Sequence, residues 1–196
     1  MSRDLHFPTP IYMFDHNDQS LNIELEKNII NWMNQDKGVQ RSNVEGWHSS
    51  TDMHQRPEYK RLVDDLFQIQ YQIYNEEYLG SEPYLGNMWA NVNPPGGYNN
   101  AHIHPNALWS GVYYIKTPKN CGNLKINDPR AAASMSRPQH KSGELPIRLW
   151  REVNYEPKAG RCIMFPSWLT HCVDINKSND IRISVSFNFM QKCLMV

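Results

Sequence analysis

The sequence lacks an excess of charge of either sign. Its 196 residues include 20 basic and 20 acidic side chains, so the formal net charge is zero with histidine neutral. Nucleic acids and anionic membrane surfaces attract proteins that carry a basic surplus. The charge balance therefore gives no indication of a nucleic-acid-binding or membrane-binding protein, although a nucleic acid as substrate stays open.

Long apolar runs and a secretion signal are also lacking. No stretch approaches the ~20 consecutive apolar residues that a membrane-spanning helix needs. The first eight residues do not show the charged and then apolar layout of a signal peptide. We therefore expect a cytoplasmic protein with no membrane partner.

Cysteine pairs are the third absence. None of the four cysteines belongs to a Cys-x-x-Cys pair. In a reducing compartment such cysteines remain free thiols. The four are Cys121, Cys162, Cys172 and Cys193.

The length and composition are those of one globular domain. Hydrophobic residues make up 40% of the chain and charged residues 20%, which is ordinary for a folded protein. No internal repeat is present. We expect a single domain over residues 1–196, with a helical support region at 1–80 and a β core at 84–190.

The first part of the chain predicts two helices. Apolar residues recur at helical spacing between Asp18 and Met33, and again from Pro57, a favoured first-turn residue, to about Glu77. An extended segment at 5–14 precedes them, and its prolines restrict it to an edge position. Residues 37–56 are polar and predict loops.

From Tyr84 onward the sequence is a series of short strand-like runs separated by turn residues. Such a series is typical of a β-sandwich or a barrel such as a jelly roll. Residues 130–146 lack periodicity and form a long loop, a kind that is usually functional or disordered. The expected strands are 85–93, 110–116, 121–127, 149–153, 161–165, 170–174 and 182–190.

The candidate chemistry begins with His102 and His104. In an extended chain these two side chains point to the same face, so their imidazoles can share one metal ion, although two exposed loop histidines would look the same. His171, which follows another predicted strand, is the best candidate for a third ligand. Eleven residues further on, Arg182 begins an alternating strand whose polar face also carries Ser184. An arginine on such a face indicates an anion pocket inside a barrel.

Five fragments in this order carry a resemblance to a known family. They are Tyr98-Asn-Asn-Ala-His-Ile-His-Pro, Ser110-Gly-Val-Tyr-Tyr-Ile, Asn127-Asp-Pro-Arg, Phe165-Pro-Ser-Trp-Leu-Thr-His and Arg182-Ile-Ser-Val-Ser-Phe-Asn. Over roughly residues 85–190 the sequence resembles the iron(II)- and 2-oxoglutarate-dependent oxygenases, in particular a group of bacterial and phage members. The resemblance implies a double-stranded β-helix, another name for the jelly-roll core, packed by the two helices.

The resemblance also implies a cofactor, two co-substrates and a set of residues. Iron(II) would be bound by His102 and His171, and the small-molecule co-substrate 2-oxoglutarate by Arg182 and Ser184, with dioxygen as the second co-substrate. Tyr113 and Asn93 occupy positions where the superfamily often has further co-substrate contacts. The implied reaction is the hydroxylation of a C–H bond, with release of succinate and carbon dioxide. By analogy with prolyl hydroxylases, the substrate would be a protein or an amino-acid side chain.

The second metal ligand departs from the family pattern. The usual carboxylate of His-x-Asp/Glu is replaced by His104. Imidazole suits iron, so a three-histidine site is chemically reasonable. Asp128 is the alternative source of a carboxylate, although an aspartate beside a proline is more often a plain turn residue.

Two other functions remain open from the sequence. One is a cupin-like dioxygenase that uses three histidines and no 2-oxoglutarate, but this enzyme would have no need of Arg182 and Ser184. The other is a non-catalytic jelly-roll binding protein. His48, beside Trp47, could face the site, but we interpret it as a plain loop residue.

Overall fold

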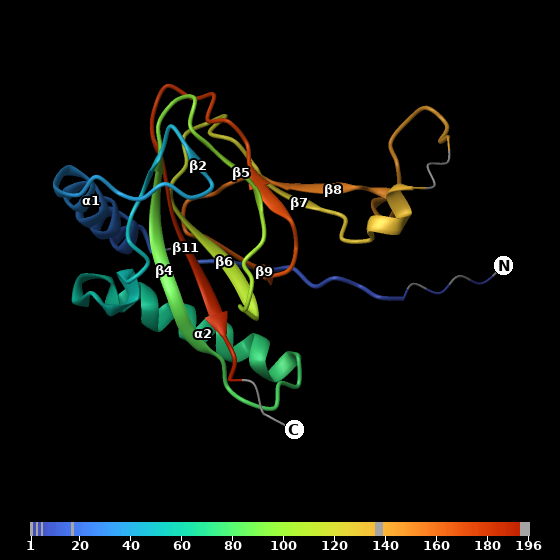
Figure 1. Ribbon diagram of the computed structural model, residues 1–196, viewed down its shortest axis with the longest axis horizontal. Helices are drawn as coiled ribbons and strands as arrows, with labels where there is room; N and C mark the ends of the chain where they lie inside the picture. The colour runs from blue at the N-terminus through green and yellow to red at the C-terminus, as the bar shows by residue number, and fades with distance from the viewer. Residues whose placement is uncertain (1, 3, 5, 17, 136–138, 193–196) are drawn as a thin grey trace.

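The computed structural model of the protein describes residues 2, 4, 6–16, 18–135 and 139–192. Over these residues, two long helices and eleven strands alternate with short turns of 3-10 helix (Figure 1). The helices are α1 (Gln19–Gln35) and α2 (Lys60–Glu76). The strands are β1 (Tyr12–Asp15), β2 (Asn43–Val44), β3 (Trp47–His48), β4 (Tyr84–Asn93), β5 (Tyr98–His102), β6 (Trp109–Lys116), β7 (Leu124–Asn127), β8 (Glu152–Tyr155), β9 (Arg161–Pro166), β10 (His171–Val173) and β11 (Arg182–Met190).

The strands form two sheets, as expected for a jelly roll. The larger sheet has the order β1-β9-β6-β11-β4-β3, and the smaller has the order β2-β5-β10-β7-β8. All the strand pairs within these sheets are antiparallel. The predicted fold class, a mainly β jelly-roll core packed by two helices, is therefore confirmed.

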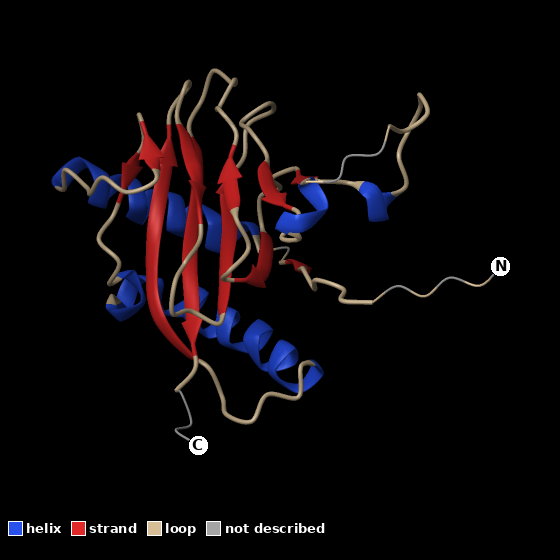
Figure 2. Cartoon of the chain, turned by 45° about the vertical axis from the view of Figure 1, so that its right-hand side comes forward, coloured by secondary structure: helices blue, strands red, loops and turns tan. Residues whose placement is uncertain are grey.

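Both helices pack against the outer face of the larger sheet (Figure 2). Strand β11 shows why this face is apolar. Its residues Ile183, Val185, Phe187 and Phe189 are fully buried in the same core cluster as the apolar residues of α1 and α2. The alternate residues, beginning with Arg182, point to the space between the two sheets, because successive side chains of a strand face opposite ways.

The N-terminal elements agree closely with the sequence predictions. Helix α1 begins after Asp18, whose carboxylate accepts a hydrogen bond from the Leu21 N–H at 3.0 Å and so caps the first turn. A 3-10 turn begins at Pro57 and leads directly into α2. Strand β1 is an edge strand of the larger sheet, as the prolines around it require.

The structure differs from the sequence predictions at several short strands. Strand β5 lies in a segment too rich in asparagine to read as a strand, and it forms because β2 and β10 pair with it on either side. The residues expected to be loops at 37–56 contain β2 and β3. Strand β7 begins at Leu124, later than predicted, because Gly122 has a positive φ of 92°, which an extended strand does not allow.

The excursion between β7 and β8 contains the predicted long loop. It includes two short 3-10 turns, Ala131–Ser134 and Ile147–Leu149, and it extends away from the two sheets (Figure 1). Residues 136–138 of the predicted loop, and Cys193 among the cysteines, lie outside the described residues. Within the described part of the chain, no helix has the length and apolarity needed to cross a bilayer.

Packing of α1 against the larger sheet predicts that a buried and an exposed substitution on this helix change the free energy of unfolding by different amounts. Leu25 is 1% exposed in the core, whereas Ile23 on the same helix is 63% exposed. We expect Leu25→Ala to lower the free energy of unfolding by about 2–5 kcal/mol, since a cavity replaces buried methyl groups. Ile23→Ala, the control, should change it by less than ~0.5 kcal/mol. Urea titration checks this, and equal effects of the two variants would contradict the packing.

Candidate metal and anion site

Three histidines come together at one end of the space between the sheets. Strands β5 and β10 are antiparallel neighbours, and their register puts His102 directly opposite His171. His104 follows β5, and its backbone N–H donates to the Ser167 carbonyl at 3.0 Å, which ties it to the loop before β10. Strand pairing thus joins histidines that lie far apart in the sequence.

The three imidazoles are close enough to hold one ion. Each side chain has a nitrogen available as a ligand atom, and these three atoms lie within 4.8 Å of one another. The ring of His102 lies 4.9 Å from that of His104 and 4.3 Å from that of His171, centroid to centroid. This is the only group of three or more such ligands among the residues that the structure describes.

Backbone carbonyls fix the tautomers of two of these histidines. Nδ1 of His102 lies 2.7 Å from the Asn100 oxygen, and Nδ1 of His171 lies 2.9 Å from the Leu169 oxygen. A carbonyl oxygen can only accept, so each Nδ1 carries the hydrogen and each Nε2 keeps its lone pair. This is the usual outer support of a metal-binding histidine.

The electrostatics of the cluster keep the histidines neutral at pH 7. Burial lowers the pKa of His102. Burial, with the neighbouring histidines adding to it, lowers the pKa of His104 to about 3, and burial together with His102 lowers that of His171 to about 4. Only a neutral imidazole ligates a metal, so a metal ion would compete with few protons near neutral pH.

An inner cavity extends from the histidine cluster between the two sheets. Its apolar walls come from Val112, Leu124, Phe165 and Val173. Among its described lining residues there is no aspartate or glutamate, and its only permanently charged group is Arg182. The cavity therefore suits an anion.

Arg182 is buried without a counter-charge. It is 1% exposed, and its Nη1 donates to the backbone oxygen of Cys121 and lies 3.4 Å from those of Gly122 and Asp174. Gly122 makes this approach possible, because a Cβ there would lie 3.0 Å from Nη1 and 2.3 Å from the Asp174 oxygen. No carboxylate of the described residues forms an ion pair with Arg182, and its Nη2 has no partner.

Arg182 and the histidine cluster line opposite stretches of the same cavity. Arg182 precedes Ser186 by four residues on β11, or about 13 Å of strand. Ser186 is opposite Trp89 on β4, whose ring lies 5.6 Å from that of His104. The histidines and Arg182 therefore line the same cavity.

The structure brings Ser184 to this cavity but not Tyr113 or Asn93, the other two predicted co-substrate contacts. Tyr113 faces the helices, and its hydroxyl donates to Oδ1 of Asn22 on α1 at 2.8 Å. Asn93 is buried opposite Arg182 in the β4–β11 register, with its amide nitrogen 3.4 Å from Oδ1 of Asn99. These two side chains thus have other partners.

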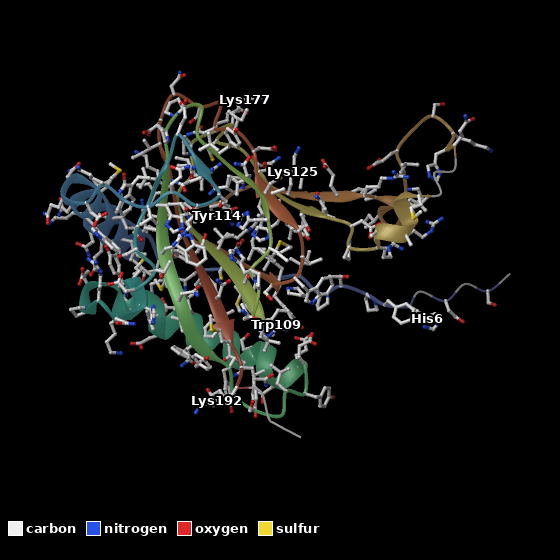
Figure 3. The ribbon with its side chains drawn as sticks, in the orientation of Figure 1. His6, Trp109, Tyr114, Lys125, Lys177 and Lys192 are labelled. Atoms are coloured by element: carbon white, nitrogen blue, oxygen red, sulfur yellow. The ribbon has the colours of Figure 1, made fainter. Side chains whose placement is uncertain are left out.

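Tyr114, which the sequence analysis missed, lines the cavity in place of its neighbour. It is 2% exposed and lies amid the strands of the barrel (Figure 3). Every residue of β6 from Trp109 to Ile115 is buried, so the sequence shows no alternation of polar and apolar residues there. No signal in the sequence tells which of the two tyrosines points inward.

Asp128, the alternative metal ligand, lies outside the histidine cluster. Its carboxylate receives hydrogen bonds from the guanidinium of Arg130 at 2.8 and 2.9 Å and from the Arg130 backbone N–H at 3.0 Å. These bonds, chiefly the one from the side chain, lower its pKa. Asp128 is a turn residue with its charge already paired.

An outer cleft opens on the other side of the histidine cluster. It shares Ser42, Trp89, His102 and His104 with the inner cavity. His48, expected in a loop, is 4% exposed in the short strand β3 and stacks on Trp89 with 5.4 Å between ring centroids. The remaining residues of this cleft are Arg41, Thr51, Asn87 and Asn188.

Comparison with known protein families identifies the chain. The model of the family described as "Putative 2OG-Fe(II) oxygenase" matches residues 87–188, just over half of the chain. The chain belongs to this family. The match spans all three histidines and Arg182, and the family's name specifies iron(II) and 2-oxoglutarate. No curated protein matches the chain in sequence.

Solved structures of 2-oxoglutarate enzymes share the fold. A prolyl-4-hydroxylase of Pseudomonas putida is 16% identical, with 94% of each chain covered and a TM-score of 0.67. The alpha-ketoglutarate-dependent carbocyclase SnoK from nogalamycin biosynthesis is 13% identical, with 93% of this chain and 80% of that chain covered and a TM-score of 0.70. The collagen prolyl hydroxylase of Paramecium Bursaria Chlorella virus-1 is 15% identical, with 92% and 96% covered and a TM-score of 0.60. At these identities the likeness concerns the fold alone.

The geometry of the cluster predicts which side chains hold the metal. We expect His102→Ala, His104→Ala and His171→Ala each to lose iron(II) binding near pH 7, because two ligands remain. Asp128→Ala is the matched control, and it should keep full occupancy since its carboxylate is bound to Arg130. Elemental analysis after loading and desalting checks this. Full occupancy in His104→Ala together with an empty Asp128→Ala would place the third ligand at the carboxylate.

Proposed function

We propose that the protein is an iron(II)- and 2-oxoglutarate-dependent hydroxylase. The observation that carries the proposal is the buried guanidinium of Arg182, which has an unpartnered nitrogen and shares a cavity with three convergent histidines. A buried charge without a partner is costly, and an anionic ligand in the cavity would remove that cost. Membership of the 2OG-Fe(II) oxygenase family supports the identity of the anion.

The residues present fit an iron(II) ion. His102, His104 and His171 would bind it through neutral nitrogens, with two Nε2 atoms oriented by backbone carbonyls. Imidazole is a ligand that suits iron, and three protein ligands leave positions open for co-substrates. When bound, the metal supplies the oxidative chemistry that couples decarboxylation of 2-oxoglutarate to hydroxylation of a C–H bond.

The chain's own residues also fit the diacid. Arg182 would pair with the distal carboxylate through its free Nη2, while Nη1 stays held by backbone carbonyls. Ser184 and Tyr114 would donate hydroxyls to the same end of the co-substrate, because both line this cavity. Burial raises the pKa of Tyr114, so its hydroxyl keeps its proton and remains a donor.

The apolar walls of the cavity serve to exclude water. Val112, Leu124 and Phe165 belong to a buried apolar cluster between the sheets. In a dry cavity an ion pair with Arg182 is stronger than in water. The protein would thus hold the co-substrate in one orientation and keep solvent away from the metal.

We propose an amino-acid side chain, free or within a protein or peptide, as the hydroxylated group. Prolyl hydroxylases among the proteins that share the fold support this choice. The oxidised C–H bond would lie beside the histidine cluster, at the junction of the inner cavity and the outer cleft. The three-histidine dioxygenase without 2-oxoglutarate loses its support, because it has no use for the unpaired Arg182.

Turnover of 2-oxoglutarate is the direct test of this function. We expect the iron-loaded protein, given 2-oxoglutarate, ascorbate and air, to release succinate and carbon dioxide, faster when a hydroxylatable peptide or amino acid is present. His171→Ala should release neither. Mass spectrometry of the products checks both statements. A wild-type protein that binds iron but neither binds nor consumes 2-oxoglutarate would refute the proposal.

The assignment of Arg182 predicts a selective loss of co-substrate affinity. Breaking a buried charge pair typically costs ~3–5 kcal/mol, so Arg182→Ala should raise the dissociation constant of 2-oxoglutarate by roughly a hundredfold or more. Arg182→Lys should recover part of the affinity, because it keeps the charge but loses the planar guanidinium that bonds the backbone and the carboxylate together. Metal content should stay unchanged, since Arg182 is not a ligand. Calorimetric titration of the metal-loaded protein measures the affinity.

A pair of adjacent tyrosines provides the internal control. Tyr114→Phe should weaken 2-oxoglutarate binding by a few-fold, the loss expected for one hydrogen bond worth ~0.5–1.5 kcal/mol. Tyr113→Phe should leave the affinity unchanged, because its hydroxyl bonds to Asn22 on the helix side. The opposite result would mean that β6 presents its other face to the co-substrate.

A further inference from the structure

The outer cleft has the features of a binding site for the substrate itself. It adjoins the inner cavity at Ser42, Trp89, His102 and His104, so a molecule bound in it lies next to the proposed metal ligands. The following inference rests on the proposed function, and it concerns the charge of the molecule that this cleft accepts.

Neither cavity contains a negative charge from the protein. No aspartate or glutamate is among the described residues that line the inner cavity or the outer cleft. The proposed metal ligands are three neutral histidines, so they leave the charge of a divalent ion fully uncompensated. Bound 2-oxoglutarate would direct one carboxylate to Arg182 and the other to the metal, which leaves a net positive charge facing the outer cleft.

Arg41 adds a second positive charge at this cleft. It is exposed, it lines the cleft, and no acidic side chain of the described residues pairs with it. The nearby Asp52 is engaged elsewhere, by the Ser50 hydroxyl and by Arg56 at 3.6 Å. The guanidinium of Arg41 is thus available to a ligand.

Neutral donors and a flat aromatic wall complete the cleft. Oδ1 of Asn87 accepts from Asn188 at 2.7 Å, so the Asn87 amide nitrogen is left to donate into the cleft. Thr51 adds an exposed hydroxyl. The stacked rings of His48 and Trp89 lie nearly parallel, with 10° between their planes, and form the apolar wall nearest to His104.

We propose that the outer cleft binds a substrate that carries a carboxylate. The carboxylate pairs with Arg41 and accepts from Asn87 and Thr51, while the apolar part of the substrate packs on Trp89 and presents a C–H bond to the metal. A cationic substrate is excluded, because like charges meet at both the metal and Arg41. The substrate is therefore an amino acid or peptide with a free or side-chain carboxylate.

The test compares acids with their neutral isosteres by direct binding. The probes are N-acetyl derivatives of the common amino acids, each as the free acid and as the carboxamide. They are titrated calorimetrically, without dioxygen, into protein loaded with iron(II) and 2-oxoglutarate. We expect at least one acid to bind more tightly than its amide. Arg41→Ala should weaken binding of that acid by about two- to fivefold, as for an exposed ion pair, and leave binding of the amide unchanged.

Arg41→Glu should remove the preference for acids altogether. Arg148→Glu is the matched control, since it makes the same charge change at an exposed arginine on the excursion between β7 and β8, away from the sheets (Figure 1). The Arg148→Glu protein should still bind the acid more tightly than its amide. The inference is overturned if no acid binds, if acids and amides bind equally, or if the preference for acids persists in Arg41→Glu.

Failure of the inference is distinguishable from failure of the proposed function. The same calorimeter first measures binding of 2-oxoglutarate to the metal-loaded protein. If 2-oxoglutarate does not bind, the oxygenase function fails and the inference falls with it. If 2-oxoglutarate binds and the acids show no advantage, only the charge assigned to the substrate is wrong.

Discussion

The register of β11 is the constraint on which the rest of the structure depends. This strand is paired on both sides, with β4 and with β6, and it alternates between an apolar and a polar face. A shift by one residue would turn Phe187 and Phe189 into the cavity and Arg182 toward the helices. The same alternation that anchors α1 and α2 therefore also aims the charged group of the site. Stability and chemistry are set by one choice of register.

Burial of Arg182 is tolerable only because the surrounding backbone is arranged for it. Carbonyl oxygens from the turn before β7 and from Asp174 accept hydrogen bonds from one of its nitrogens. Gly122 has no side chain to block this approach. The other nitrogen is buried without a partner. Incomplete satisfaction of a buried cation is what distinguishes a ligand site from a structural ion pair, and the three neutral histidines at the far end of the cavity add no negative charge to complete it.

Strongly periodic parts of the chain could be predicted from the sequence, and parts held by tertiary pairing could not. The helical spacing of apolar residues between Asp18 and Met33 and the alternation of β11 are both local features of the sequence. The predictions of this helix and of this strand are therefore confirmed. The sequence order also singled out His102, His104 and His171, which the structure brings together. Strand β5 was missed because asparagines dominate it and its neighbours supply its stability. Tyr113 was expected at the co-substrate but faces the helices, because β6 is buried on both faces and shows no alternation. His48 was interpreted as a loop residue because β3 has only two residues.

The central position of β11 also has a consequence for how the chain folds as it is synthesised. All other strands of the larger sheet leave the ribosome before β11 does, yet β11 lies between β4 and β6 in the finished sheet. Until it arrives, β4 and β6 each expose an unpaired hydrogen-bonding edge, which is a template for association with other chains. The nascent protein must therefore keep two half-sheets apart, and the barrel closes late, by insertion of the strand that carries Arg182.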